Sequence, residues 1–146
     1  ILPDTVKVIG QSAFVRCSLN YIRMPRRLKE LGSYAFYSSA LKKITVYGKV
    51  ELGETFKYCK KLKTVVLKEG VKELGELVFH QCPKLRSVTV PKSVKGLVCI
   101  YDNIFYYRGL KCNLSKLTIK TPKNSEMYRY RKFWKKRYKI KVKVIK

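Results

Sequence analysis

The chain of 146 residues predicts a solenoid of stacked repeats, and three observations lead to this fold class. An apolar segment that ends in glycine recurs along the chain, and a phenylalanine follows each of these glycines. A phrase Leu-x-x-Ile/Val-x-apolar comes next, and its leucine advances by 22, 21, 23 and 29 residues between positions 19 and 114. A period in the twenties indicates one supersecondary unit per repeat, which must stack on its neighbours to bury its apolar face.

Each leucine phrase is predicted to be a short strand. Its apolar residues, at a spacing of two, point inward and the residues between them point outward. Stacked in register about 4.8 Å apart, about five such strands form a parallel sheet on one side of the solenoid. The apolar segments that end in glycine are predicted to form the opposite side of each coil, and we call them return strokes. Short helical or 3₁₀ corners follow them and place each phenylalanine in the core. We expect a positive φ or close backbone packing at the four glycines: Gly10, Gly32, Gly53 and Gly75.

The chain divides into two parts. Residues 1–119 form the repeat array, in which an insert at 98–109 is rich in aromatic residues. Insertions in repeat proteins form loops, often on the binding face, although these aromatics also suit a small core under the loop. Because residues 1–4 already lie inside a repeat, we expect a C-terminal piece of a longer protein, with any signal peptide upstream. The open N-terminal end of the stack then predicts self-association through that end.

Residues 120–146 form a basic capping segment. Asn124 or Ser125 can cap a helix that presents a stripe of Met127, Tyr130 and Trp134 and ends near Tyr138. Apolar residues then alternate with lysines from 139 to 144, which predicts a half-buried closing strand. A capping helix and a strand cover the end of a stack, and lysines protect an exposed strand edge from further pairing.

The formal net charge of +25 arises from 34 lysines and arginines against nine acids. Such a charge attracts polyanions in a salt-dependent way, although lysines also serve solubility alone. Residues 120–146 hold twelve of these cations and one acid, a net of +11. No run of about 18 apolar residues is present, so the sequence predicts no membrane span.

Three phrases together resemble the BspA-type leucine-rich repeat. They are Leu-x-x-Val-x-Val-Pro at 85–91, Val-x-x-Ile-Gly at 6–10 and Ala-Phe-x-x-Cys at 13–17. The resemblance implies a right-handed leucine-rich-repeat solenoid on secreted or surface-anchored proteins of bacteria and some parasitic protists. It also implies adhesion to host matrix or neighbouring cells. The chain departs from the family in its more basic C-terminal segment and in its aromatic insert.

The cysteines are predicted to form a reduced inward column. Four of them precede the repeat leucine by two or three residues, and Ser39 takes this place in the second repeat: Cys17, Cys59, Cys82 and Cys112. A disulfide between adjacent rungs and a metal site remain alternatives, although short Cys-x-x-Cys spacings are absent from the sequence. Cys99 lies outside the pattern.

No catalytic, cofactor-binding or metal-ligating residue is predicted, so the sequence indicates a protein that is not an enzyme. His80 is the only histidine, and a buried thiol such as Cys82 would be a poor nucleophile beside it. The sequence contains no phosphate-binding glycine loop and no serine elbow. Glu30, Glu51 and Glu73 with Lys29 and Lys72 are predicted to form a salt-bridged convex face.

Two surfaces are candidate binding sites. The first is the concave face of the sheet, because solenoids commonly bind partners there. Its two predicted columns are Tyr21, Lys43, Thr64, Ser87 and Lys116, and Arg23, Thr45, Val66, Thr89 and Thr118. The second is the basic flank, where cations interleave with aromatic rings and can bind phosphates, stacked bases or sulfated glycans. Its predicted residues are Arg129, Arg131, Lys132, Lys135, Lys136 and Arg137.

These surfaces predict a non-enzymatic binding module, and the resemblance implies adhesion and a place on a cell-surface or secreted protein. Its partner would be a host extracellular protein or glycan, bound through the solenoid face and the basic flank. One alternative is a binder of an anionic polymer, either a sulfated glycan or, less favoured, a nucleic acid, through the flank. Another is a structural stalk that has no ligand of its own.

Overall fold

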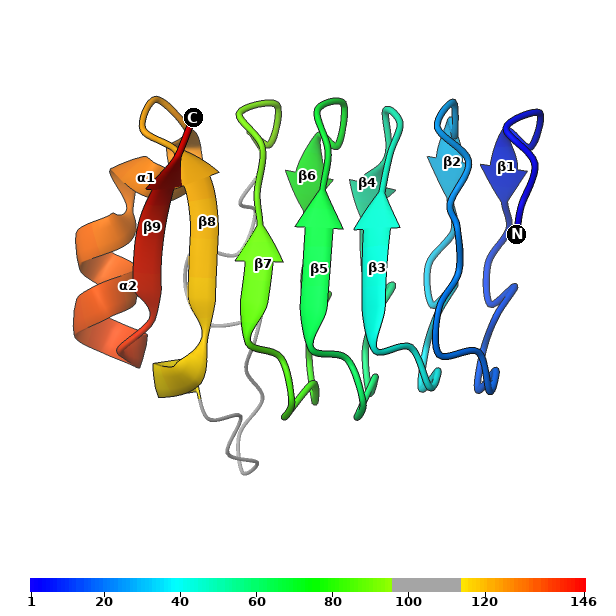
Figure 1. Cartoon of the computed structure of the whole chain (residues 1–146), viewed down its shortest axis with the longest axis horizontal. Helices are drawn as coiled ribbons and strands as arrows, with labels where there is room; N and C mark the ends of the chain where they lie inside the picture. The colour runs from blue at the N-terminus through cyan, green and yellow to red at the C-terminus, as the bar shows by residue number, and fades with distance from the viewer. Residues whose placement is uncertain (96–113) are drawn as a thin grey trace.

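The computed structural model describes residues 1–95 and 114–146. The predicted insert at 98–109, together with Cys99 and Cys112, lies outside the described residues. The described chain forms a row of stacked coils with the N-terminus at one end and a helical cap at the other (Figure 1).

Five parallel strands form the main sheet. This confirms the predicted parallel sheet along one side of the solenoid. Their order in the sheet follows the sequence, and a parallel bridge from Tyr21 to Lys43 adds the first repeat. Parallel pairing of consecutive repeats is what a coil of constant period produces. The strands are β3 (Lys43–Val46), β5 (Thr64–Leu67), β7 (Ser87–Thr89), β8 (Thr118–Pro122) and β9 (Lys141–Ile145).

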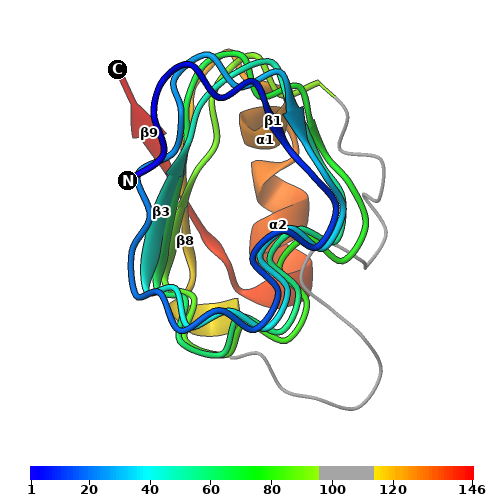
Figure 2. The ribbon, with the colours of Figure 1, turned by 90° about the vertical axis from the view of Figure 1, so that its right-hand side faces the viewer.

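The return strokes form two shorter parallel sheets on the other side of the coil. One pairs β1 (Val8–Ile9) with β2 (Glu30–Leu31), and the other pairs β4 (Glu51–Leu52) with β6 (Glu73–Leu74). Viewed along the stack, successive coils nearly overlie one another and enclose the core between the two sides (Figure 2). The apolar residues of both sides meet in this space.

Among the four glycines that end the return strokes, close packing requires glycine at Gly32, whereas a Cβ at Gly10 would meet nothing within 4 Å. A Cβ at Gly32 would lie 2.3 Å from the backbone nitrogen of Gln11, a separation that only glycine permits. The expectation of a positive φ at these glycines is wrong. Among the described residues, the glycines with positive φ are Gly48 and Gly70, which lie in the turns after the main-sheet strands.

A stack of phenylalanine rings runs through the corners that follow the glycines. Phe36, Phe56 and Phe79 are at most 1% exposed, and Phe14 at the N-terminal end is partly buried. Successive ring centroids lie 5.2, 5.7 and 5.9 Å apart with interplanar angles of at most 11°. The sequence prediction that each corner places a phenylalanine in the core is therefore confirmed for these repeats.

The corners are tight turns bonded to the next coil. The Phe14 amide donates to the Ala35 carbonyl at 2.7 Å, and the Phe36 amide donates to the Thr55 carbonyl at 3.0 Å. Within a corner, bonds span three residues, such as the Cys17 amide to the Phe14 carbonyl, which is a 3₁₀-type bond. Backbone groups at the corners are thus satisfied between coils, as burial requires.

The cap closes the C-terminal end of the stack. A 3₁₀ turn, η1 (Leu114–Lys116), leads into β8, and two helices follow, α1 (Glu126–Arg129) and α2 (Arg131–Tyr138). Met127 and Trp134 are 2% exposed, so the predicted stripe faces the core. No helix in the described part of the chain is long and apolar enough to cross a membrane.

Candidate functional site

The outer face of the main sheet carries two columns of side chains in register. The first runs Tyr21, Lys43, Thr64, Ser87, Thr118 and Lys141. The second follows the first by two residues in each strand and runs Thr45, Val66, Thr89, Lys120 and Lys143. Arg23 lies two residues beyond Tyr21, so it precedes Thr45 at the N-terminal end. Nearly all of the predicted sheet residues therefore share one face.

The predicted position of the fifth repeat is wrong by two residues. Ser87 pairs with Thr118 and Thr89 pairs with Lys120, whereas Lys116 lies in η1 and outside the sheet. The predicted closing strand is β9, which pairs with β8 at the end of the main sheet. Its pairing adds Lys141 and Lys143 to the columns, where the sequence analysis had not placed them.

This register divides the sheet face into a neutral centre and two cationic ends. Thr64, Ser87 and Thr89 are half-buried and uncharged at the centre. At the N-terminal end, Arg23 pairs with Asp4, with 3.6 Å between Nη2 and Oδ2. At the other end the lysines of β8 and β9 are exposed. A partner that lies along the face would meet hydroxyl groups first and charge at both margins.

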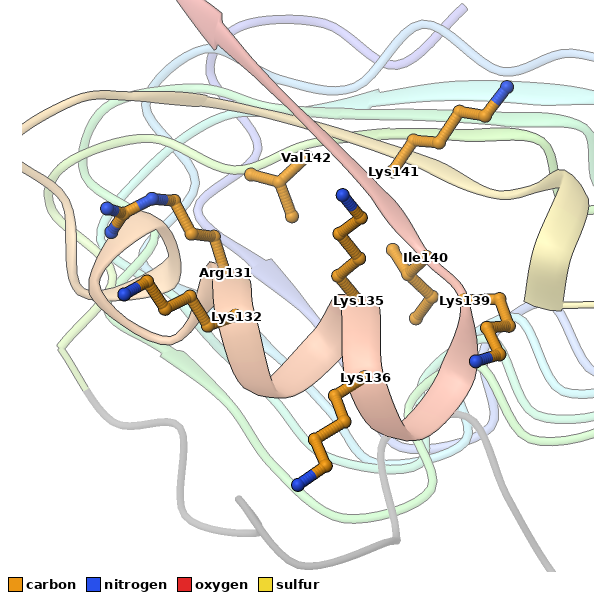
Figure 3. A pocket seen from close by; sticks show the side chains of 8 residues that line it. All are labelled: Arg131, Lys132, Lys135, Lys136, Lys139, Ile140, Lys141 and Val142. Atoms are coloured by element: carbon orange, nitrogen blue, oxygen red, sulfur yellow. The ribbon is translucent and has the colours of Figure 1, made fainter.

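The basic flank forms a groove of about 780 Å³ between α2 and β9 (Figure 3). Cations line most of it, and two apolar residues complete the lining, one just before β9 and one within it. The lining residues are Arg131, Lys132, Lys135, Lys136, Lys139, Lys141, Ile140 and Val142.

Local sequence signals position this groove. Ser125 is the N-cap of α1, and its hydroxyl accepts the Tyr128 amide at 3.1 Å. The Ser125 hydroxyl also bonds the buried Thr121 hydroxyl at 2.6 Å, which ties the helix start to β8. At the other end, Lys139 adopts a left-handed conformation with φ 59° and ends α2, so that the fully buried Ile140 can turn the chain into β9.

Four of the six predicted flank residues line the groove, namely Arg131, Lys132, Lys135 and Lys136. Arg129 lies in α1 and Arg137 is not among the lining residues. Sequence reasoning missed Lys139 and Lys141, because they follow the helical stripe and enter the groove only when β9 folds back along α2. The alternation of lysine and apolar residues in the last strand was the signal that could have identified them.

The aromatic rings of the flank pack against one another and toward the core. Trp134 is 2% exposed, and its ring lies 5.4 Å from that of Phe133 and 5.9 Å from that of Tyr138. The Arg131 guanidinium lies 4.3 Å above the Tyr128 ring, a cation–π contact. These rings therefore hold the cap together, and the cations face solvent.

Comparison with known protein families identifies the repeat type. A model of the BspA type leucine rich repeat region matches residues 1–111 and 54–134 with six copies. The chain belongs to this family. Its predicted family membership and its predicted fold are therefore both confirmed.

Two solved structures share the fold of this BspA-type chain. A leucine-rich repeat protein from Bacteroides ovatus is 26% identical, with a TM-score of 0.59 over 86% of this chain and 34% of that protein. The pneumococcal vaccine antigen PcpA is 18% identical, with a TM-score of 0.70 over 97% of this chain and 34% of the antigen. The chain thus spans about a third of the length of these two structures. A search of the curated proteins finds no match.

The cysteines of the BspA-type repeats form the predicted inward column. Cys59 and Cys82 are buried, and Cys17 is partly buried at the end of the stack. The Cys59 thiol donates to the Phe36 carbonyl at 3.0 Å, and the Cys82 thiol donates to the Phe56 carbonyl at 3.1 Å. Cys59 is a free thiol, and burial raises the pKa of this thiol. A raised pKa reduces the thiolate fraction, so this column is structural.

A polar corner lies beside the phenylalanine stack. Glu54 accepts hydrogen bonds from Lys57 and from the Tyr34 hydroxyl. Partial burial opposes ionisation of Glu54, but these two bonds prevail and hold the pKa of Glu54 below its ordinary value. Burial, assisted by the charge of Lys57, lowers the pKa of His80 nearby. The corner is an internally paired cluster. Within residues 1–95 and 114–146, no group of three His, Cys, Asp or Glu side chains could hold a metal ion.

The predicted column of charges lies over the return strokes. It lines a polar trough of about 600 Å³ over these short strands. Lys72 pairs with Glu51 at 3.8 Å between Nζ and Oε1. The trough contains Lys29, Lys72, Glu30, Glu51 and Glu73. Positive and negative side chains alternate in this trough. Their electrostatic potentials therefore partly cancel, and the trough does not favour a ligand of one charge.

Proposed function

We propose that the chain is a non-enzymatic binding module of a cell-surface or secreted protein, which docks a host extracellular protein or glycan on the outer face of its main sheet. The observation that carries this proposal is the continuous register of outward side chains across the strands of the main sheet. Stacked repeats present such a surface with little loss of conformational freedom on binding.

The membership of the BspA-type family supports this role and supports a place outside the cell. The centre of the face suits a protein or glycan partner, because hydroxyl groups can donate and accept hydrogen bonds there. Cations at its two ends, including those of the basic flank, would add long-range attraction to an anionic partner.

The test is binding to a fibrinogen-coated surface and to a neutral glycan surface at about 0.15 M salt. The variant Val66→Tyr places a bulky neutral side chain at the centre of the face, where a tyrosine suits a strand. We expect it to abolish salt-tolerant binding. The matched control, Ser33→Tyr, changes an exposed position on the opposite side and should bind as the unaltered chain does. Equal binding by both variants would reject the sheet face, and absence of binding to either surface would favour a stalk.

A further inference from the structure

We propose that the groove between α2 and β9 binds a linear sulfated polysaccharide. The proposal deepens the binding role proposed above and rests on it, because it assigns a ligand class to the basic flank of the same module. The six cations that carry it are Arg131, Lys132, Lys135, Lys136, Lys139 and Lys141.

The charge of the groove is not neutralised within the described structure. The three ion pairs found among residues 1–95 and 114–146 all lie in the repeats, at Arg23, Lys57 and Lys72. Glu126 is the one acid among residues 120–146, and it begins α1 outside the lining of the groove. Six cations around one concave space focus a positive potential into it, and this attracts an anion.

Three of the cations are arranged along a line. Arg131, Lys135 and Lys139 are spaced by four residues along α2 and its C-cap, which places them about 6 Å apart along the helix axis. Figure 3 shows Lys135 rising between α2 and β9, with Arg131 and Lys132 toward one end and Lys139 toward the other. Charges repeated along a groove fit a polymer with anionic groups along its length better than a single small anion.

The groove also has an apolar element. Val142 is partly buried against the core, beside the fully buried Ile140. The C–H face of a sugar ring can pack on the exposed part of Val142 and on the aliphatic stems of the lysines, while sulfate groups reach the surrounding ammonium groups. A volume of about 780 Å³ is large enough to hold a few units of a polysaccharide chain.

The same features argue against a nucleic acid. Single-stranded nucleic acids are bound by exposed aromatic rings on which bases stack. The Trp134 ring is buried and packs against its aromatic neighbours, so it offers no such platform.

The experiment measures the affinity of the full chain for immobilised heparin over a salt series. Desulfated heparin and single-stranded oligo-dT serve as comparison probes. We expect heparin binding to weaken by about 10³-fold between 50 and 200 mM salt if all six cations contact sulfates, by analogy with phosphate contacts. Desulfated heparin and oligo-dT should bind at least about tenfold more weakly than heparin at each salt concentration.

Two variants of equal charge separate the groove from the net charge. The groove variant is Lys132→Gln with Lys135→Gln and Lys136→Gln, which should reduce the salt dependence of log affinity by about half because three of six contacts are lost. The control is Lys60→Gln with Lys61→Gln and Lys63→Gln, three exposed lysines of the third repeat, and it should leave that slope nearly unchanged. Circular dichroism checks that both variants are folded.

Equal weakening by the two variants would overturn the groove in favour of diffuse net charge. Tight binding of desulfated heparin, or groove-dependent binding of oligo-dT as tight as that of heparin, would overturn the ligand class. The groove variant should still bind the fibrinogen-coated or neutral glycan surface, while Val66→Tyr should still bind heparin. Failure of the groove is therefore distinguishable from failure of the sheet face.

Discussion

The repeats and the cap bury apolar surface in the same way but present different surfaces to solvent. In both, one stripe of side chains faces a common core: Phe36 and Phe56 in the repeats, Met127 and Trp134 in the cap. Residues 1–119 carry a net charge of +14, whereas the 27 residues from 120 to 146 carry +11. The comparison teaches that the cap completes the fold and also concentrates positive charge on its outer surface, which is the basis of the ligand proposed for it.

The largest change in the free energy of unfolding is expected for a substitution in the repeats. Phe56→Ala should reduce the free energy of unfolding by about 3–5 kcal/mol, because it removes a fully buried ring between two stacked neighbours. Phe14→Ala is the matched control, since Phe14 occupies the same slot in the first repeat, is partly buried and stacks on one ring. Urea unfolding measures both. Equal losses would contradict the account in which burial between two stacked rings determines the loss of stability.

A smaller loss of stability is expected for a substitution at the start of the cap helix. Ser125→Ala should cost about 1 kcal/mol through loss of the N-cap, and more if the buried Thr121 hydroxyl is left unpaired. Asn124→Ala is the control, because the exposed Asn124 was the other candidate cap and the structure assigns the cap to Ser125. Thermal unfolding followed at 222 nm compares them. A larger loss for Asn124→Ala would show that the helix begins one residue earlier.

Acid should affect the polar corner of the repeats. The pKa of Glu54 is lower in the folded chain than its ordinary value of 4.5. The ionised form therefore stabilises the fold above about pH 4.5, and this contribution is lost as the pH falls through the folded-state pKa. Glu54→Gln should lower stability at pH 7 and flatten its decline below pH 4.5. Parallel pH–stability curves for the two proteins would contradict the pairing of Glu54 with Lys57 and Tyr34.

The smallest change in stability is expected for a substitution on the surface of the cap. Lys132 and Lys136 are four residues apart on α2, and like charges at this spacing destabilise a helix by about 0.2–0.5 kcal/mol. Lys132→Gln should therefore leave stability unchanged or raise it by this amount at low salt, with the difference screened at high salt. A clear loss of stability would mean that Lys132 supports the fold and would weaken its assignment to a binding site.

Most of the fold could be predicted because the repeat period specifies it. Apolar residues at a spacing of two identify the inward face of each strand, as at Ile44 and Val46 in β3, both fully buried. The register of the fifth repeat could not be predicted in the same way. A slip of one residue would exchange the two faces of the strand, but a slip of two leaves the alternation unchanged. Leu117 and Ile119 are both buried, so the pattern fits either register.

The groove was only partly predictable. The density of cations in residues 120–146 identified the flank, and helical periodicity identified which aromatic residues turn inward. Whether Lys139 and Lys141 join Lys135 depends on the left-handed residue that ends α2 and on the pairing of β9 with β8. The position of these two lysines is set by tertiary structure and not by local sequence, because it depends on which edge of the sheet is free to pair with β9.

The most direct test of the account compares the Val66→Tyr variant and the groove variant with the unaltered chain on fibrinogen-coated, neutral glycan and heparin surfaces over one salt series. The account predicts a reciprocal result: Val66→Tyr loses the salt-tolerant binding and keeps heparin binding, whereas the groove variant weakens heparin binding, with about half of its salt dependence, and keeps the salt-tolerant binding. If one variant weakens both kinds of binding, or neither variant weakens any, the assignment of separate partners to the sheet face and the cap is contradicted.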